Sequence, residues 1–580
     1  MTLRQTIGAE SALAAAVAAV LYALTLSPGV GAGDGGELML AAASFGVPHP
    51  PGYPLWTLAA AAAAQLPIGA LPIRVNALSA LFAALAAGLL WALARRAGLG
   101  RFGAAVAASL YAVSIPVWRT AVEAEVYSLA AALFLALVHL AWNASRPGAG
   151  AVASPRADAL FFFGAGLAYL AHQTLAAPAL FLGAALLARA FSWRRLAAAA
   201  AWCFLGLTPA LVTAVRAGAA GAYAWKERGP LEAVGDVFSR GAYGAVAQNP
   251  PRLDFAAGAL SGMAGVVLSG LGAAAVALAA YGLWAAWRDR APGGAEAPLR
   301  LPALAALSIP AGLAAFVRFT PDAEHLAQVE PFLIPVTAIA ALYAGAGAGR
   351  LARALPREGR AAAAGAAGRL APRVAAAALS LAVVATAALH FDRCDRSGFR
   401  LPERYGRDLL AAVPAGASLV LDGDNETFLA AYLVGLEGAR PDLSLRHRRG
   451  CAFGDAYGLA GLPRAAWEAR ARAADLAAIA SGGAGVWYAT LPSDLERAGV
   501  TAESRGLVAR ALPPGSAPAD RWSAPAGWPR SSDLLGGRPE RYDFVTRKLA
   551  VSYSDAAGRA AWERGDAAAA LAWYEDAARV

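Results

Sequence analysis

Charged side chains are scarce in this sequence: Asp, Glu, Lys and Arg make up 16% of its 580 residues, whereas they make up about a quarter of a typical soluble domain. Hydrophobic residues account for 58% of the chain, and its mean hydropathy is +0.47. Apolar runs of about 18 residues or more, long enough to cross the hydrocarbon, explain this composition. Such runs must be helical, because lipid offers unpaired backbone groups no partner. The composition excludes a soluble globular protein and predicts an α-helical polytopic membrane protein.

Cysteine is also rare, with three residues in the chain. Cys203 lies within a predicted span, where a cysteine behaves as a small buried apolar residue. Cys394 and Cys451 fall in a water-compatible C-terminal region. They could form a disulfide if that region lies outside the cytoplasm.

Several familiar signatures are missing. No Cys and His spacing of a metal site is present. The glycine-rich run at residues 31–36 is not a phosphate loop, because no Lys-Ser/Thr pair follows it and no strand precedes it. A serine-hydrolase constellation is absent too. No cofactor is therefore assigned, although Asp34 and Glu37 with another exterior carboxylate could hold Mg²⁺ or Mn²⁺.

The net charge of +10 does not indicate a nucleic-acid partner, because the arginines lie in short loops between apolar spans rather than on one soluble face. If the N-terminus is cytoplasmic, these loops all fall on the cytoplasmic side, which is the positive-inside pattern. We therefore predict a multi-pass protein of the cytoplasmic (inner) membrane, with the N-terminus inside and the C-terminal domain outside. The arginines are Arg95, Arg96, Arg146, Arg156, Arg189, Arg194, Arg195, Arg288, Arg290, Arg300, Arg350, Arg353, Arg357, Arg360, Arg369 and Arg373.

Length and hydrophobicity predict about eleven transmembrane helices. The first is interpreted as a retained span rather than a signal peptide, because one basic residue precedes it and no small-residue cleavage pattern follows. A shorter apolar segment at 55–70 is expected to dip into the outer leaflet. The eleven predicted spans lie near 9–27, 76–94, 102–117, 125–143, 158–172, 174–190, 197–216, 263–286, 301–317, 331–348 and 373–390.

From about Phe391 the sequence becomes water-compatible over a length sufficient for a domain. We predict a membrane domain over 1–390, an extracytoplasmic soluble α/β domain over 391–550, and a helical hairpin like one tetratricopeptide repeat over 551–580. One such hairpin cannot bury its own apolar face, so we expect it to pack on the preceding domain. Strands are expected at 419–422, 443–445 and 486–489.

The predicted exterior loops carry carboxylates and histidines. Ionisable groups near the membrane are costly to bury and therefore indicate function. Because five loops far apart in sequence carry them on one side, we expect a single exterior cavity. The residues are Asp34, Glu37 and His49; Glu123 and Glu125; His172; Trp225, Lys226, Glu227, Arg228, Arg240 and Tyr243; and Asp322, Glu324, His325 and Glu330.

The most specific stretch begins with Asp34 and Glu37, whose spacing places both carboxylates on one side of a helical turn. The alternative is a capping box, in which Asp34 caps the helix and Glu37 closes back on it. Four prolines hold a stiff path around His49, which could bind an anion, carry a proton or simply bond to backbone.

The other candidates also have structural alternatives. Arg74 could bind a lipid phosphate bidentately or extend to the membrane interface. Glu123 and Glu125 cannot both face one way on a helix, so at most one is expected to line the cavity. His172, taken alone, is more often structural. Trp225, with Trp118 and Tyr53, could stack on a sugar ring, although a belt of aromatic residues at the membrane interface is the commoner explanation.

Four segments, residues 24–30, 33–37, 49–54 and 74–76, resemble the N-terminal signature of a bacterial family related to protein O-mannosyltransferases. That family has a eukaryotic member that O-mannosylates receptor ectodomains. One segment departs from the family pattern: Trp225-Lys-Glu-Arg-Gly229 replaces a usual Trp-Gly-acid run. Further matches are Glu125-Val-Tyr-Ser128, His172-Gln-Thr174, Arg240-Gly-Ala-Tyr243, Asp424-Asn425 and Arg440-Pro-Asp442.

The resemblance implies a GT-C type glycosyltransferase with its active site in the first exterior loop. It implies a polyprenyl-phosphate-linked sugar donor, mannose being the expected sugar, and Ser or Thr of an exported protein as the acceptor. Asp34 would be the catalytic base, with Glu37 beside it, and attack on the anomeric carbon would invert its configuration. The residues expected to bind substrate are His49, Tyr53, Arg74, Asn76, Glu125, His172 and Arg240.

Two other functions remain open from the sequence. The acceptor could be a lipid or a surface glycan, or the protein could be a transporter or flippase. Transporters tend to have paired repeats with interrupted helices at the bilayer midplane. This chain has no evident repeat, and its polar residues gather on one side, which favours an enzyme.

Overall fold

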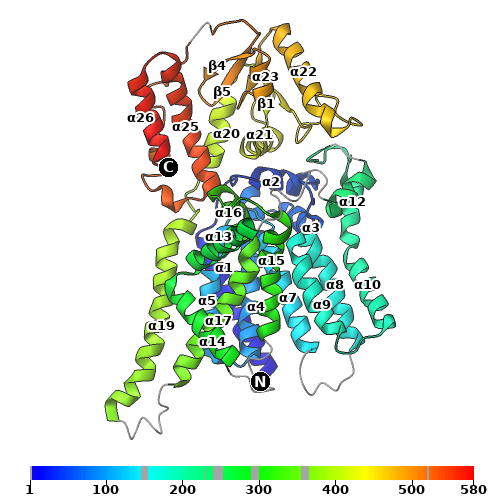
Figure 1. Cartoon of the computed structure of the whole chain (residues 1–580), viewed down its shortest axis with the longest axis vertical. Coiled ribbons are helices and arrows are strands. Elements are labelled where there is room, and N and C mark those ends of the chain that lie inside the picture. The colour runs from blue at the N-terminus through cyan, green and yellow to red at the C-terminus, as the bar shows by residue number, and fades with distance from the viewer. Residues whose placement is uncertain are drawn as a thin grey trace.

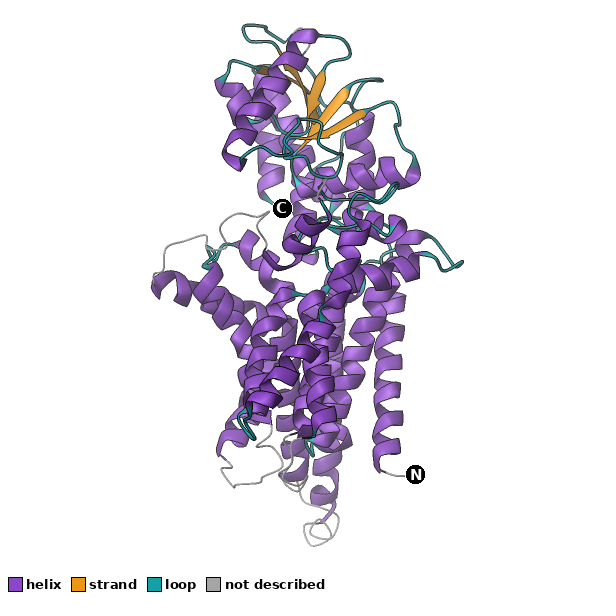
Figure 2. Ribbon diagram, turned by 90° about the vertical axis from the view of Figure 1, so that its right-hand side faces the viewer, coloured by secondary structure: helices purple, strands orange, loops and turns teal. Residues whose placement is uncertain are grey.

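The computed structural model describes residues 3–144, 154–226, 229–239, 253–288, 299–354, 365–518 and 521–580. A helical bundle forms one end of the molecule, and a domain with a β-sheet forms the other (Figures 1 and 2). The N-terminus lies at the far end of the bundle, whereas the C-terminus lies beside the sheet domain. This arrangement of a multi-pass helical membrane region and a separate α/β domain is the one that the hydropathy pattern predicts.

Seven described helices or helix runs are long and apolar enough to cross a membrane, or eight if α5 and α6, bent by 63° relative to one another, form one span. This number is lower than the predicted eleven, in part because the apolar helical stretches Tyr127–Trp142 and Gln173–Leu187 are too short to count as spans. The helices of this region are α1 (Leu3–Leu24), α2 (Gly35–Ser44), α3 (Pro54–Ala64), α4 (Leu71–Arg96), α5 (Gly100–Ala112), α6 (Ile115–Ala121), α7 (Tyr127–Ala144), α8 (Pro155–Ala171), α9 (Ala176–Leu187), α10 (Trp193–Gly206), α11 (Leu211–Arg216), α12 (Pro230–Ser239), α13 (Leu253–Leu271), α14 (Ala273–Arg288), α15 (Arg300–Gly312), α16 (Ala323–Val329), α17 (Ile334–Ala354) and α19 (Gly365–Cys394).

Two predicted segments differ from the structure. The span predicted at 263–286 is divided into α13 and α14 by Gly272, whose φ of +83° is left-handed and ends the first helix. The apolar segment at 55–70 contains α3, which ends at Ala64 rather than continuing to residue 70. The guanidinium of Arg74 donates hydrogen bonds to the carbonyls of Ala64 and Leu66, and so satisfies acceptors at the end of α3.

The C-terminal domain is built on a five-stranded sheet with the order β2-β1-β3-β5-β4. β1 is parallel to β2 and β3, whereas β5 is antiparallel to β3 and β4. The three strands expected from the sequence are β1, β2 and β3; β4 and β5 were not expected. The elements are α20 (Leu401–Ala411), β1 (Ser418–Leu421), α21 (Asp424–Glu437), β2 (Ser444–His447), α22 (Trp467–Ser481), β3 (Val486–Tyr488), α23 (Ser493–Arg497), β4 (Thr501–Arg505), β5 (Val508–Leu512) and α24 (Ser531–Leu534).

The chain ends in a helical hairpin of α25 (Phe544–Glu563) and α26 (Ala567–Ala578), which begins earlier than the expected residue 551. Gly558 lets the two helices approach closely, because a Cβ there would lie 2.8 Å from the ring of Tyr574. The hairpin packs on the α/β domain: Tyr553 donates a hydrogen bond to Asp408 of α20 at 2.7 Å, and its carbonyl accepts one from the indole of Trp528 at 2.9 Å.

Cys394 and Cys451 do not form the disulfide that the sequence allowed. Cys394 is the last residue of α19 and Cys451 follows β2; both are buried, and neither they nor Cys203 is part of a disulfide.

The two domains meet at a buried arginine just beyond α19. Arg396, with 2% of its side chain exposed, lies between Glu123 of the membrane region, at 3.6 Å, and Asp543 before the hairpin, at 3.2 Å. Its guanidinium also stacks on Phe399, 5.0 Å from the ring centre. Burial raises the pKa of Glu123 to about 7, although the charge of Arg396 opposes that shift. This cluster fixes the C-terminal domain against the bundle.

Candidate active site

Helix α2 positions two carboxylates of the segment that follows α1. Asp34 occupies its N-cap position and Glu37 its first turn. The capping-box alternative is not what the structure contains, since the Asp34 side chain accepts no capping hydrogen bond. Instead Glu37 is fully buried, whereas 38% of the Asp34 side chain is exposed. Of this pair, Asp34 is therefore the carboxylate that a substrate can reach.

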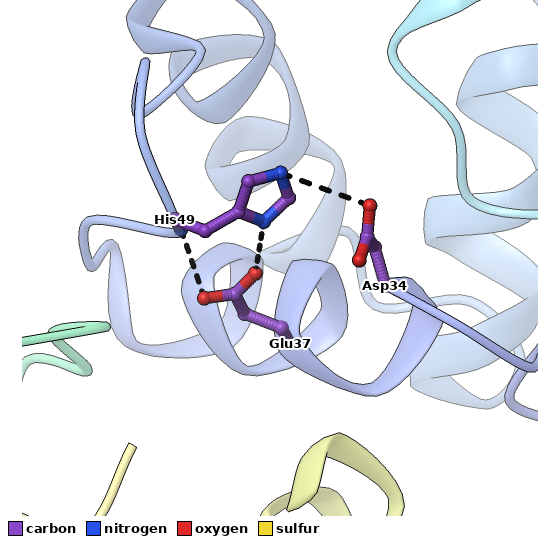
Figure 3. Close-up of side chains that lie close together, drawn as sticks. All are labelled: Asp34, Glu37 and His49. Carbon is purple, nitrogen blue, oxygen red and sulfur yellow. Dashed lines mark hydrogen bonds and ion pairs between the residues drawn. The ribbon is translucent and has the colours of Figure 1, made fainter. Parts of the chain in front are cut away.

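His49 lies between the two carboxylates (Figure 3). Its Nδ1 contacts Glu37 Oε2, its backbone N–H donates to Glu37 Oε1 at 2.9 Å, and its Nε2 lies 3.7 Å from Asp34 Oδ2. The hydroxyl of Tyr223 donates a further hydrogen bond to Glu37 Oε1 at 2.9 Å. Both carboxylate oxygens of Glu37 therefore contact protein groups, and the contact of Oε2 with Nδ1 holds the His49 ring in place.

The electrostatics of this cluster favour a protonated His49. Burial alone would lower the pKa of His49, but the charges of Asp34 and Glu37 and the hydrogen bond to Glu37 outweigh burial and raise the pKa well above 6.5. Burial raises the pKa of Glu37, an effect that the neighbouring imidazole partly offsets. The site therefore holds a cationic ring beside a solvent-accessible carboxylate.

The loop after His49 continues the site. The Tyr53 hydroxyl lies 3.2 Å from His49 Nε2. Tyr53 has a φ of +39°, a left-handed backbone that a non-glycine residue adopts only when its surroundings impose it. Its ring stacks on that of His172, with centroids 6.2 Å apart, and His172 also contacts Tyr127 and Phe332. Sequence candidates from two separate loops therefore meet here.

Glu123 and Glu125 lie in the segment between α6 and α7 rather than on a helix, so the helical argument for their directions does not apply to them. Glu123 pairs with Arg396 at the domain junction. Burial, followed by repulsion from Asp34 and Glu123, raises the pKa of Glu125 well above its usual value. Glu125 thus belongs to the electrostatic environment of Asp34, and its raised pKa favours the neutral acid.

Asn76 and Arg74, which the sequence suggested as substrate-binding residues, make structural hydrogen bonds instead. Asn76 is fully buried and donates hydrogen bonds to the carbonyls of Ser27 and Gly29, at 2.8 and 3.1 Å, so it supports the loop that leads to Asp34. Arg74 is engaged at the end of α3, as described above. Arg240 lies outside the described residues, as do Glu227 and Arg228.

The C-terminal domain forms one wall of the site. Asn425 Oδ1 of α21 accepts a hydrogen bond from the backbone N–H of Gly33 at 2.8 Å. Gly36 of α2 lies against the backbone of α21, since a Cβ there would lie 2.2 Å from the Phe428 carbonyl oxygen. Burial and then the charge of Asp34 raise the pKa of Asp424. Asp424 and Asn425 were noted in the sequence only as part of the resemblance.

Backbone hydrogen bonds also join three distant segments: the loop around Val47, the segment from Tyr223 to Trp225, and the segment that follows β2. Tyr223 and Trp225 exchange backbone hydrogen bonds with Val47, at 2.8 and 2.9 Å, and the carbonyl of Trp225 accepts one from Ala452 at 2.8 Å. These hydrogen bonds bring the Tyr223 hydroxyl to Glu37. Nothing in the sequence around Tyr223 indicated that role, because it depends on a backbone pairing between distant loops.

Asp34, Glu37 and His49 each offer a potential ligand atom, all within 4.8 Å of one another, as a metal site would require. In this structure the ring nitrogens of His49 face Glu37 Oε2 and Asp34 Oδ2, and Glu37 Oε1 accepts hydrogen bonds from the His49 backbone and from Tyr223. A cation bound here would have to replace the contacts between the imidazole and the two carboxylates. We therefore assign no step to a metal ion.

The fold and the site define a multi-pass helical membrane protein with an acidic site where the bundle meets the α/β domain. Residues 34–194 match the family model described as the Protein O-mannosyl-transferase TMEM260 N-terminal domain. The chain is 44% identical over 119 residues to Protein O-mannosyl-transferase TMEM260 of Mus musculus, covering 20% of this chain and 17% of the mouse protein. It is 55% identical over 38 residues to Protein O-mannosyl-transferase tmem260 of Dictyostelium discoideum, covering 7% of this chain and 5% of that protein.

These matches confirm the resemblance inferred from the N-terminal motifs, and the family model covers the segment from Asp34 through His172. The chain therefore spans less than a fifth of either curated relative. Among solved structures, ArnT from Cupriavidus metallidurans bound to undecaprenyl phosphate aligns with 75% of this chain and 89% of its own, at 16% identity and a TM-score of 0.43.

Proposed function

We propose that this protein is a membrane glycosyltransferase of the GT-C type. It transfers a sugar, mannose in the first instance, from a polyprenyl-phosphate donor to Ser or Thr of an exported protein. The observation that carries the proposal is a solvent-accessible carboxylate, Asp34, that lies 3.7 Å from the ring of His49 where the helical bundle meets the α/β domain (Figure 1). The matching relatives, both named protein O-mannosyl-transferases, support this reaction class.

The chemistry follows from the two charges. Asp34 removes the proton from the acceptor hydroxyl while the oxygen of that hydroxyl attacks the anomeric carbon of the donor sugar. The bond between the anomeric carbon and the phosphate oxygen breaks at the same time. The lipid phosphate leaves with the bonding electrons, and a single displacement of this kind inverts the anomeric configuration. The developing negative charge on the phosphate needs a nearby cation, a role that suits the His49 imidazolium.

Glu37 has a different role from Asp34 in this proposal. It is fully buried, and its oxygens are engaged by His49 and Tyr223, so it does not contact substrate. We assign it as a positioning residue that keeps the His49 ring oriented and charged. Tyr53 and His172 form the aromatic wall beside the imidazole and are the residues suited to contact a sugar ring.

We further propose that the site faces away from the cytoplasm, because the arginine-rich loops lie on the opposite side of the predicted spans. A C-terminal tag should then be accessible to protease on the outer face of the cytoplasmic membrane in spheroplasts. Protection of the tag, with digestion only after detergent is added, would place the site on the cytoplasmic side.

The decisive experiment supplies radiolabelled polyprenyl-phosphate mannose and candidate exported proteins to the purified full-length protein. Asp34→Asn should lower transfer by about a hundredfold or more, because it removes the base with almost no change in volume. Asp555→Asn, a matched change on an exposed face of α25, should transfer at the wild-type rate. Equal activity of Asp34→Asn and wild type would refute the assigned base.

The product distinguishes the acceptor classes. Label released from protein by β-elimination indicates attachment to Ser or Thr, as proposed. Label in a lipid or glycan fraction would identify the other acceptor class instead. Movement of intact donor across a vesicle membrane without transfer would support a flippase.

A further inference from the structure

A cavity lies outside the active site, at the junction of α19, α20 and the segment before the hairpin. Its volume is about 370 Å³, within the usual range for small-ligand pockets. Three arginines and two aromatic residues dominate its lining, with one carboxylate among them. These six residues are Arg400, Arg404, Arg541, Phe399, Tyr542 and Asp395.

The cavity lies at the level where the chain leaves the membrane. Arg396, one residue beyond Asp395, donates its backbone N–H to the carbonyl of Thr25 at 3.0 Å, just past the end of α1. It therefore joins the outer ends of α1 and α19. Leu389 of α19 is 76% exposed and lies about 9 Å along the chain from Asp395. An apolar, lipid-facing helix surface thus leads to the cavity, and Figure 1 shows α19 rising to the base of the hairpin.

The arginines retain donors for a further anion. Arg400 contacts Glu403 at 3.3 Å, while Arg404 Nε lies 3.6 Å from Asp408, beyond hydrogen-bonding distance. The arginine side chains at positions 400 and 404 are 58% and 53% exposed. Each guanidinium has five N–H donors, so these contacts leave capacity for a bidentate oxyanion.

Arg541 is the third cation of the cavity. It donates to the carbonyl of Asp392 at 3.0 Å and to its carboxylate at 3.3 Å, which anchors the guanidinium to the end of α19. The partners of the three arginines, Glu403, Asp408 and Asp392, are not among the lining residues. Within the lining itself, three positive groups face one carboxylate. The lining thus carries an excess of positive charge, and it also includes the apolar residues Leu401 and Leu534.

We propose that this cavity binds the phosphate headgroup of an anionic glycerophospholipid from the outer surface of the membrane. Arginine pairs with phosphate through charge-assisted, often bidentate hydrogen bonds. The position beside a lipid-facing helix favours a lipid over a soluble acidic peptide, because acyl chains can follow α19 while the headgroup enters the cavity. The site is separate from Asp34 and does not depend on the proposed transferase activity.

Binding here also has a structural consequence. Arg400 lies over Gly29 of the first exterior loop, where a Cβ would be 3.2 Å from its guanidinium. A headgroup held by Arg400 would thus connect the membrane surface to both the C-terminal domain and the loop that leads to Asp34.

The test uses the purified full-length protein in detergent, with lipid binding followed by native mass spectrometry. Phosphatidylglycerol should bind more tightly than phosphatidylcholine, whose headgroup carries no net charge. Arg400→Gln with Arg404→Gln should weaken phosphatidylglycerol binding by about tenfold or more. Arg559→Gln is the matched control, because Arg559 is 50% exposed and pairs with Asp555 on α25, and neither residue lines the cavity.

Each alternative result overturns the proposal in a recognisable way. Equal binding of both lipids, or an equal effect of the control variant, would exclude recognition of lipid charge here. Displacement by inorganic phosphate at matched concentration would indicate a free-phosphate site, and displacement by an acidic peptide would indicate a protein partner. Should the double variant aggregate, Arg404→Gln alone provides the same comparison, since Arg404 makes the weaker of the two contacts with carboxylates.

Discussion

The Asn425 side chain accepts a hydrogen bond from the backbone N–H of Gly33, at 2.8 Å, across 392 positions of sequence. Gly33 immediately precedes Asp34, so this bond positions the candidate base through the backbone of the preceding residue. The domain that carries Asn425 is therefore part of the site rather than an appendage to it. The effect is local: one acceptor in α21 fixes the entry to α2.

Replacing Asn425 with Ala removes that acceptor and leaves the Gly33 N–H unpaired. We expect kcat for sugar transfer to fall by about tenfold with little change in KM, because misplacement of the base affects the chemical step most. Asn425→Asp keeps the acceptor and adds a negative charge near Asp34. It should therefore restore much of the activity and move the acidic limb of the pH–rate profile upward. Identical profiles for both variants would argue against positioning through this bond.

Gly36→Ala tests the packing of α2 on α21. An added Cβ would lie 2.2 Å from the Phe428 carbonyl oxygen, so the helices must separate. We expect a loss of roughly 1–3 kcal/mol in stability, measured as a lower thermal midpoint and faster proteolysis between the domains. Gly35→Ala is the neighbouring control, because its Cβ would meet only Val30, at 3.9 Å. Similar thermal midpoints for the two variants would contradict this close approach.

The pair of Glu37 and His49 should make folding stability depend on pH. The pKa of His49 is raised well above 6.5, so its stabilising contribution is fully present below pH 6.5 and is lost as pH rises through the folded-state value. Burial also raises the pKa of Glu37 above 4.5, which adds a loss of the same sign as pH rises. The thermal midpoint of the wild type should therefore decline with rising pH, relative to a Glu37→Gln, His49→Gln double variant.

Thermal unfolding of both proteins across pH 5 to 9 measures that difference. His325→Gln serves as the control, because His325 lies in a partly exposed ion pair with Asp322 on another loop. It should retain the wild-type pH dependence. Parallel curves for the wild type and the double variant would show that this pair does not titrate as inferred.

Arg396→Gln should weaken the junction between the domains. It leaves Glu123 and Asp543 close together without their shared cation, and breaking a buried ion pair typically costs roughly 3–5 kcal/mol. Arg538→Gln is the matched control, since Arg538 is 59% exposed in its pair with Asp392 and surface pairs contribute about 1 kcal/mol or less. The comparison is made by thermal midpoint. An equal effect of the two variants would contradict a junction stabilised through Arg396.

The hydropathy pattern was sufficient to predict the membrane class, because apolar length alone decides whether a helix can cross lipid. The number of spans was less predictable. Composition does not reveal that Gly272 adopts a left-handed φ and ends α13, or that α5 and α6 are bent by 63°. Strands β1, β2 and β3 were recognisable as short apolar runs before turn residues. β4 and β5 were missed because their alternating polar residues do not form such a run.

The sequence by itself determined that Asp34, Glu37 and His49 belong to one segment between the first two predicted spans, because apolar length alone sets where those spans end. Only the tertiary structure decided that Asp34 is exposed while Glu37 is buried, because that distinction depends on Tyr223 and on the packing of α2 against α21. It also showed that Asn76 supports the first loop and that Arg74 satisfies carbonyls at the end of α3. Residue type specifies which bonds a side chain can make, whereas the contacts between distant segments determine which bonds it does make.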